Sequence, residues 1–528
     1  MYLLLLLSSP FLISLIIGTG KQNYRTILGA LLFISLIYPL SILANYAVKP
    51  VVVLPVLFEA SWAYHPYTLV TTCAFLLLGG IVIIFNDSLM DKQQLMVIGF
   101  AISSTLGITF ANSYITFILS WELLTVATAL IIFTDRTHKN ALGTVFLITH
   151  LVAGLSLLFG ILLHFNVAGS LEIVPPVAGT VFFILGIGTK AAFIPLHFWL
   201  PNTYPKVSPG ATIALSIFTT KAGIFALARI LPPMEIVAYI GGIMALYGVY
   251  RALQQTTMRS LLCYHIISQL GYMIASISIG SEIGMNGGLL HLLNHMVYKT
   301  LLLMIAAAVI YLYGSDNLCI RQRKPWWLVI MALIASFAII GLPPLNGFIS
   351  KSLIKYATSG MFLQLIVSIA SVGTALSFAK FLYFGFLRDA LSQPLIKEVD
   401  KRLPNTAVVA MTLLAGLTIA FGVNMNLISA LLPYPFLSPY SFKAISASLQ
   451  IAALGFVIFL FVRPLLDPAN HHDTRTASQT VAKTISMRDY LINAISKLED
   501  QLTSLANAPS LLVSITAIIL TLFIVFFN

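Results

Sequence analysis

Long apolar runs separated by short polar segments follow one another along almost the whole chain. A helix that crosses the hydrocarbon core of a bilayer needs roughly 17–25 predominantly apolar residues. On this criterion we predict about sixteen spans, which begin near Tyr2, Thr26, Pro66, Leu95, Tyr114, Ala141, Pro176, Val207, Met234, Arg259, Met285, Trp326, Met361, Thr406, Lys443 and Ser510. The pattern predicts an all-α polytopic membrane protein.

The composition supports this class. The chain has 528 residues, of which 59% are hydrophobic and only 9% are charged, too few charges to cover a soluble surface. We interpret the opening run, "MYLLLLLSSPFLISLIIGTGK", as the first span because no basic residue precedes it, as one would in a signal peptide. Cys73, Cys263 and Cys319 are too widely separated to suggest a disulfide framework, a metal site or an iron–sulfur cluster. We therefore expect no cofactor and no metal.

The net charge of +12 has a topological explanation. When the connections between predicted spans are numbered, the odd ones hold about twenty Lys and Arg residues and the even ones about four. Basic loops stay in the cytoplasm, so this imbalance predicts cytoplasmic odd connections and both termini on the periplasmic side. Nucleic-acid binding is not needed to explain the charge.

One soluble-looking stretch, 467–509, precedes the last predicted span. Its second half, "MRDYLINAISKLEDQLTSLA", has the apolar spacing of an amphipathic helix that lies along the cytoplasmic face. It is either a tether for the last span or a strut against a neighbouring subunit. We divide the chain into N-terminal spans (1–65), a translocating core (66–390), C-terminal spans (391–465), and a lateral segment with the final span (466–528).

Six ionisable residues lie inside the apolar runs: Glu122, Lys190, Lys221, Lys299, Lys351 and Lys380. Each charge at the centre of a bilayer costs roughly 2.5–3.5 kcal/mol on insertion scales. Because folding does not require this expense, the residues suggest an ion pathway; a purely structural membrane anchor is hard to reconcile with five buried lysines. Lys380 lies nearer the cytoplasmic end, so relay and snorkelling to the interface remain equal interpretations.

Two lysines lie beside predicted helix breaks. In "LGIGTKAAFIPLHFWLP", Lys190 precedes Pro195, and in "AIIGLPPLNGFISKSL", prolines and glycines precede Lys351. Proline interrupts a membrane helix and frees a carbonyl, which is tolerated beside a polar or watered cavity. Transporters build midplane ion sites in this way, and the repeated device suggests two related halves. Glu122, in mid-span, is expected either to form a structural ion pair or to be a proton site governed by a nearby lysine.

In "HLLNHMVYKTLLLM", His291, His295 and Lys299 recur every four residues and so share one helix face. Three titratable groups on one stripe favour a proton relay. A metal site from the two histidines is a weaker interpretation, since Lys299 would repel a cation. We interpret His150, His164, His197 and His265 mainly as packed core residues, with His197 gaining interest because it follows the first break.

Five ordered motifs carry a family resemblance: "SWELL" with Glu122, "TKAAFIPLHFWLP" with Lys190, "FTTKAGIFALAR" with Lys221, "HLLNHMVYK" with His291, His295 and Lys299, and "GLPPLNGFISK" with Lys351. Together they resemble the antiporter-like subunits shared by respiratory complex I, membrane-bound hydrogenases and Mrp-type cation/proton antiporters. The match runs from roughly Pro66 to Ala390. Within the family, the sequences of these motifs resemble the D-type component of Mrp antiporters most.

The resemblance implies two inverted five-helix repeats with a broken helix in each. It also implies a Glu122–Lys190 pair, a central Lys221, a link through His291, His295 and Lys299, and a terminal Lys351. Lys380 extends the family pattern as a further relay residue. The implied partners are other membrane subunits of a hetero-oligomeric complex, the lipid bilayer, protons and Na⁺.

The function that follows is proton translocation in a multisubunit Na⁺/H⁺ antiporter of a bacterial inner membrane. The alternatives are a proton-pumping subunit of an NADH-quinone oxidoreductase or hydrogenase-type complex, and proton-coupled uptake of inorganic carbon. If the chain belongs to an antiporter or an uptake system, it is a transport component rather than an enzyme.

Overall fold

A computed structural model describes residues 51–54, 60–62, 67–86, 89–90, 92–135, 141–319, 323–388, 402–429, 431–435 and 438–468. The spans predicted near Tyr2, Thr26 and Ser510, and the amphipathic stretch, lie outside the described residues. A two-stranded antiparallel sheet, β1 (Val51–Leu54) and β2 (Ala60–Trp62), comes first. The other elements of the described chain are helices.

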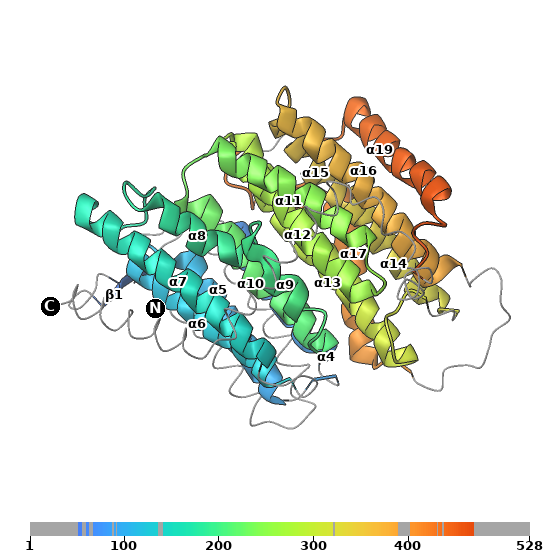
Figure 1. Cartoon of the computed structure of the whole chain (residues 1–528), viewed down its shortest axis with the longest axis horizontal. Helices are drawn as coiled ribbons and strands as arrows, with labels where there is room; N and C mark the ends of the chain where they lie inside the picture. The colour runs from blue at the N-terminus through green and yellow to red at the C-terminus, as the bar shows by residue number, and fades with distance from the viewer. Residues whose placement is uncertain are drawn as a thin grey trace, which may run out of the picture.

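The helices lie side by side in one elongated bundle (Figure 1). The first set is α4 (Thr68–Asn86), α5 (Lys92–Phe110), α6 (Tyr114–Phe133), α7 (Ala141–Ala168), α8 (Thr180–Lys190), η1 (Leu196–Phe198), α9 (Trp199–Thr203) and α10 (Pro209–Ile230). The second set is α11 (Glu235–Leu253), α12 (Met258–Ile277), α13 (Glu282–Tyr313), α14 (Trp326–Ile340), α15 (Asn346–Ala357), α16 (Phe362–Leu382), η2 (Tyr383–Leu387), α17 (Asn405–Val423), α18 (Asn426–Ser429) and α19 (Phe442–Val462).

Every predicted span in the described part of the chain lies on a helix. Eleven of these helices are long and apolar enough to cross a membrane. The two remaining spans, which begin near Pro176 and Trp326, are each divided into an apolar first half, α8 or α14, and a second piece after a break. Hydropathy therefore located the spans, and the prolines located the two interruptions.

Two successive sets of five segments have the same plan. The first runs from α5 to α10 and the second from α11 to α16, and in each set the fourth segment is broken (α8/α9 and α14/α15). Equivalent pairs pack together: α5 with α6 as α11 with α12, and α7 with α8 as α13 with α14. Because five is an odd number of spans, the second set starts from the opposite end of the bundle, so the two sets are inverted relative to each other.

Local sequence explains where several helices begin. Ser113 closes a capping box with Thr116 at the start of α6, and Ser208 caps α10 directly before Pro209 at its first position. Side-chain oxygens at these positions satisfy backbone donors that have no partner within the helix. The ends of spans are thus fixed by short polar residues in an otherwise apolar sequence.

Small residues allow close contact between helices inside the bundle. A methyl group on Gly248 of α11 would lie 2.5 Å from the backbone nitrogen of Ser268 in α12, so the two backbones touch there. Packing of this kind, rather than hydrophobic expulsion from water, holds membrane helices together.

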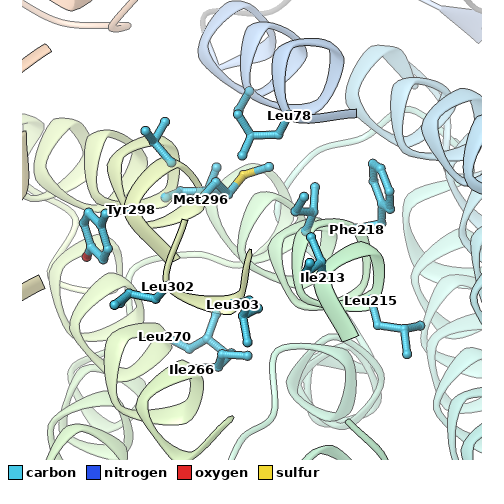
Figure 2. Packing of buried hydrophobic residues seen from close by; sticks show 14 of the residues in the cluster. Leu78, Ile213, Leu215, Phe218, Ile266, Leu270, Met296, Tyr298, Leu302 and Leu303 are labelled. Atoms are coloured by element: carbon cyan, nitrogen blue, oxygen red, sulfur yellow. The ribbon is translucent and has the colours of Figure 1, made fainter. Parts of the chain in front are cut away.

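The two halves meet in an apolar junction built from α4, α10 and α13. Figure 2 shows Leu78 of α4 facing Met296 of α13, with Ile213 and Phe218 of α10 beside them. All four side chains are at most 1% exposed. The two halves are therefore closely packed against each other at this junction.

Candidate functional site

The first break follows Lys190, the last residue of α8. The chain turns through Ala192 in a left-handed conformation (φ 58°) and resumes as η1 and α9. The indole of Trp199 donates to the carbonyl of Thr189 at 3.0 Å. A backbone group exposed by the interruption is thereby satisfied inside the protein, as the bilayer interior requires.

The second break separates α14 from α15 at Gly341, whose φ of 93° favours glycine. Lys351 Nζ donates to the carbonyl of Ile339 at 2.7 Å, and Ser448 Oγ donates to the carbonyl of Gly341 at 2.6 Å. Lys351 therefore satisfies the end of the helix that the break interrupts. This contact gives the lysine a structural anchor next to the discontinuity.

Glu122 lies at mid-helix in α6, and its carboxylate rests against the backbone of Gly154 in α7. A Cβ atom on Gly154 would overlap Glu122 Oε1 and lie 2.7 Å from Cδ. Both carboxylate oxygens are buried and have no hydrogen-bond partner among the described residues. A buried carboxylate in this state is expensive, which marks it as a candidate for proton binding.

Lys190 turns toward the same helix as Glu122 but binds neutral oxygens. Its Nζ donates to the carbonyl of Trp121 at 3.1 Å and to Thr125 Oγ1 at 3.0 Å, and it lies 4.1 Å from the centre of the Trp121 ring. The described residues contain no ion pair between Lys190 and Glu122 within 4.0 Å, although the two are within electrostatic range. The pair implied by the resemblance is thus open in this structure.

Lys221 occupies the centre of α10 and is fully buried. Its Nζ donates to the carbonyl of Ser216 at 2.6 Å and to Thr220 Oγ1 at 3.2 Å, both on its own helix. One turn of α10 packs on the first break, since a methyl group on Gly223 would lie 2.9 Å from the carbonyl carbon of Lys190. Lys221 therefore lies between the first broken helix and the second half.

The imidazole of His291 has hydrogen-bond contacts with three side chains. One ring nitrogen lies 2.9 Å from Ser350 Oγ of α15 and the other 3.1 Å from Gln269 Oε1 of α12. Tyr298 OH approaches the latter nitrogen at 3.5 Å. These contacts hold the imidazole between three helices, directly beside the residue that precedes Lys351.

His295 and Lys299 continue the stripe that the sequence predicted on α13. The ring centres of His291 and His295 are 6.2 Å apart, and neither nitrogen of His295 has a hydrogen-bond partner among the described residues. Lys299 Nζ turns to α12 and donates to the carbonyl of Leu262 at 2.5 Å. Lys221 and Lys299 are both within electrostatic range of His295, so these three groups from α10 and α13 are close together.

Lys351 and Lys380 are also buried. Lys351 Nζ lies 4.8 Å from the centre of the Tyr272 ring, which is 6.0 Å from the ring of His291. Lys380 Nζ donates to the carbonyls of Leu253 and Gln255 at 2.6 and 2.8 Å. Leu253 is the last residue of α11 and Gln255 follows shortly after it, so the amine of Lys380 caps this helix end.

Several polar residues of the site carried no signal in the sequence. Thr125, Gln269, Ser350 and Tyr298 are ordinary residues of apolar helices until the fold places them against Lys190 or His291. His150 lies one turn before Gly154 on α7 and so on the helix face that Glu122 contacts, which the sequence alone could not show. Neither His150 nitrogen has a hydrogen-bond partner among the described residues, and its ring centre is 4.5 Å from that of Trp199.

The other three histidines have polar contacts. His164 accepts from the backbone of Val177 at 3.2 Å, which agrees with a packed structural residue. His197 Nε2 lies 3.0 Å from Tyr247 OH, and His265 Nε2 lies 2.8 Å from Ser377 Oγ.

All five lysines share one feature: each donates to at least one backbone carbonyl, at distances between 2.5 and 3.1 Å. A carbonyl oxygen accepts a hydrogen bond from an ammonium group and, more weakly, from a neutral amine, so either protonation state keeps these contacts. Lysine amines and imidazoles are side chains whose protonation state changes readily when they are buried. Among the described residues, no group of three or more His, Cys, Asp or Glu side chains could hold a metal ion.

These features define a polytopic helical membrane protein with paired broken helices and a line of buried ionisable groups. The chain belongs to the NADH:quinone oxidoreductase/Mrp antiporter transmembrane family, whose sequence pattern matches residues 111–377. The family expected from the motifs is thereby confirmed, as is the fold.

Individual relatives come from different assemblies. The chain is 28% identical over 378 residues to hydrogenase-4 component B of Escherichia coli (strain K12), covering 62% of this chain and 55% of that protein. It is 29% identical over 275 residues to a K(+)/H(+) antiporter component of the A/B type from Rhizobium meliloti (strain 1021), covering 47% of this chain and 28% of that one. The chain thus spans about half or less of the length of these relatives.

The fold is similar to that of a chain in the Mrp complex from Dietzia sp. DQ12-45-1b, with a TM-score of 0.76 at 21% identity, covering 99% of this chain and 62% of that chain. At this identity the similarity establishes the fold alone. The antiporter relative named above is of the A/B type, and the particular likeness to the D-type component stays a prediction.

Proposed function

We propose that this chain is the proton-translocating subunit of a multisubunit monovalent cation/proton antiporter in a bacterial inner membrane. The observation that carries the proposal is the set of five buried lysines with neutral oxygen acceptors. A structural anchor gains nothing from five such groups, each of which is expensive to insert.

In this proposal the proton route follows the order of the groups along the bundle. It begins at Glu122 and Lys190, continues through Lys221, and crosses to the second half at His295. From there it passes His291 and Lys299 to Lys351, with Lys380 as a further relay. The domains 66–390 and 391–465 are proposed as the translocating core and its flanking spans.

The open Glu122–Lys190 arrangement suggests how the route is controlled. Lys190 has two alternative partners on one helix: the neutral Trp121 carbonyl and Thr125 hydroxyl that it binds here, and the unpartnered carboxylate of Glu122. A proton arriving at Glu122 removes the carboxylate charge and favours the neutral partners. Departure of that proton favours the ion pair, and the movement of Lys190 changes the charge that Lys221 experiences.

Two other functions remain in the same family. A redox-driven pump is favoured by the relationship to hydrogenase-4 component B, and proton-coupled uptake of inorganic carbon uses the same membrane groups. The antiporter is preferred here because the motifs resemble that branch, and because the relatives include a component of a K(+)/H(+) antiporter. Each function requires other membrane subunits as partners.

The first experiment purifies the intact complex from native membranes through a tag on this chain. Antiport predicts that only membrane subunits co-purify and that adding Na⁺ or K⁺ to everted vesicles collapses a respiration-generated pH gradient. Co-purifying iron–sulfur or flavin proteins would instead identify a redox pump, and a zinc-containing partner would indicate carbon uptake.

Matched carboxylate variants test the role of this chain in that activity. Glu122→Gln is expected to reduce cation-dependent proton movement to near background, whereas Glu235→Gln, at an exposed position at the start of α11, is expected to retain it. Equal transport by both variants at equal complex content would refute the proposal.

A further inference from the structure

A buried polar stripe runs along the second half of α16. Ser371, Thr374, Ser377 and Lys380 follow one another at intervals of three residues, and each is at most 1% exposed. Residues three apart adjoin on the surface of a helix, so this row winds around α16, from Ser371 on one side to Lys380 on the other. Ser371 and Ser377 contact α12, and Lys380 contacts the end of α11.

Two titratable groups contact the stripe, one at its first residue and one at Ser377. Tyr272 OH lies 3.0 Å from Ser371 Oγ, and the Tyr272 ring is the one beneath Lys351. His265 Nε2 lies 2.8 Å from Ser377 Oγ. The stripe therefore begins beside Lys351 and ends at Lys380.

His265 lies within electrostatic range of Lys299 and Lys351. On α12 it lies between Leu262, whose carbonyl accepts from Lys299, and Gln269, whose side chain contacts His291. The imidazole is fully buried, and its Nδ1 has no hydrogen-bond partner among the described residues. It thus has one ring nitrogen on the stripe and one without a partner.

The stripe is closed at one end of the bundle. A separate apolar cluster fills the space between the first half of α16 and its neighbours; it consists of Ala238, Ala245, Tyr272, Ala275, Ile354, Leu363, Val367 and Ala370. Leu363, Val367 and Ala370 lie on α16 directly before the stripe begins. Water entering from that end would have to cross this apolar packing.

The opposite end has a polar character. Lys380 donates to carbonyls at and just after the last residue of α11. Three arginines lie at the same end of the bundle: Arg251 in the last turn of α11, Arg259 in the first turn of α12, and Arg388 directly after η2. By the positive-inside rule this end is the predicted cytoplasmic face.

We propose that the α16 stripe is a separate proton branch, which joins the central lysines through His265 and Ser377 to Lys380 and opens where α11 ends. This inference deepens the proposed function and rests on it. In the branch, a proton reaches one ring nitrogen of His265 while the other nitrogen releases its own, so the imidazole returns to its starting charge. His265 is then a relay residue rather than the packed core residue that its sequence context suggested.

Side-specific labelling tests the open end of the branch. In the intact complex, with the three native cysteines replaced by alanine and transport retained, Ser377→Cys is compared with Ala375→Cys. Ala375 faces α19, where it packs against Gly455, so it lies off the stripe on the same turn. A membrane-impermeant sulfonated thiol reagent is applied to everted or right-side-out vesicles.

The branch predicts that Ser377→Cys reacts at least about tenfold faster from the predicted cytoplasmic side than Ala375→Cys does, because thiolates react only where water reaches them. Equal slow labelling of both variants from both sides, or faster labelling of Ser377→Cys from the opposite side, would overturn the proposal.

Transport then separates a relay from a structural contact. His265→Asn keeps a side chain that can bond to Ser377 but cannot carry a proton, and is expected to lower proton movement by at least about tenfold, in the range of a lost acid–base group. A merely structural His265 would tolerate asparagine and fail only as His265→Leu.

The two proposals fail in different ways. If the wild-type complex moves no protons but Ser377→Cys labels from the predicted side, the proposed function fails and the stripe is a water-accessible path without proton transport. If wild type and His265→Asn transport equally while Glu122→Gln does not, the branch fails and the proposed function stands.

Discussion

The contact between Glu122 and Gly154 leads to the sharpest prediction for the first half. In Gly154→Ala the new methyl group would overlap Glu122 Oε1 and lie 2.7 Å from Cδ, against the 3.4 Å at which ordinary van der Waals contact begins. The carboxylate carbon must therefore retreat by about 0.7 Å at least, and Oε1 by more. Overpacking of this kind costs about 1–3 kcal/mol, partly offset by about 0.5–1 kcal/mol of improved helix propensity.

The expected result is a loss of transport that exceeds the loss of stability. Displacements near 1 Å can lower the rate of a positioned reaction by up to about a hundredfold, so we expect at least a tenfold decrease in cation-dependent proton movement. The assay is dequenching of a pH-gradient dye in everted vesicles, normalised to the amount of complex. Gly416→Ala is the matched control, because no atom lies within 4 Å of a methyl group at that position of α17.

A double variant links the effect to the carboxylate. Shortening the acid in Glu122→Asp withdraws it from the added methyl group, so the two substitutions together should be less harmful than the product of their separate effects. The reasoning is refuted if Gly154→Ala transports as well as Gly416→Ala, or if the two substitutions combine without any coupling.

Three further predictions concern the lysines. Thr125→Val removes one of the two hydrogen-bond acceptors of Lys190. We expect the bound position of the lysine to lose about 1 kcal/mol of stabilisation and proton transport to slow severalfold. Wild-type transport rates in vesicles would contradict this prediction. Gly223→Ala places a methyl group 2.9 Å from the carbonyl carbon of Lys190 and is expected to lower thermal stability of the purified complex, by an overpacking cost of about 1–3 kcal/mol. Burial raises the pKa of the Cys319 thiol, and the charge of Lys380 opposes that rise. Lys380→Met should therefore raise this pKa further, leave less thiolate at pH 8 and slow the alkylation of Cys319. An unchanged rate of alkylation would indicate that Lys380 is uncharged.

The sequence predicted the architecture well because membrane insertion is encoded locally. A span needs a run of apolar residues and a break needs proline or glycine, and both are visible in a single segment. The span expected near Tyr114 is α6, which begins at that residue, and the one expected near Ala141 is α7. The paired breaks beside Lys190 and Lys351 were also visible, since each combines a charge with a proline inside an apolar run.

The partners of the buried charges could not be predicted in the same way. Which atoms a lysine contacts depends on how helices distant in sequence rotate against each other, and apolar helices with little amphipathicity carry no signal for that rotation. Thus Lys190 binds the Trp121 carbonyl and Thr125 rather than the expected carboxylate. Likewise, Lys380 reaches the end of α11, more than a hundred residues away.

Lys380 also shows how structure refines an open choice. The sequence left relay and snorkelling equal, because a lysine near the end of a span can extend to the interface. The side chain is fully buried, and its amine donates to half-buried carbonyls at and just after the end of α11, on the predicted cytoplasmic side. The amine therefore caps a helix end, and its role as a relay residue stays a prediction.

The central claim is that protons cross the membrane through the buried lysines of this chain. Its most direct test is proton flux through the intact complex in proteoliposomes, comparing Lys221→Met with Lys443→Met. Lys221 is fully buried between the two halves, whereas Lys443 lies exposed in the first turn of α19. We predict that Lys221→Met abolishes cation-coupled proton flux while Lys443→Met retains the wild-type rate. Wild-type flux through a correctly assembled Lys221→Met complex would contradict the account.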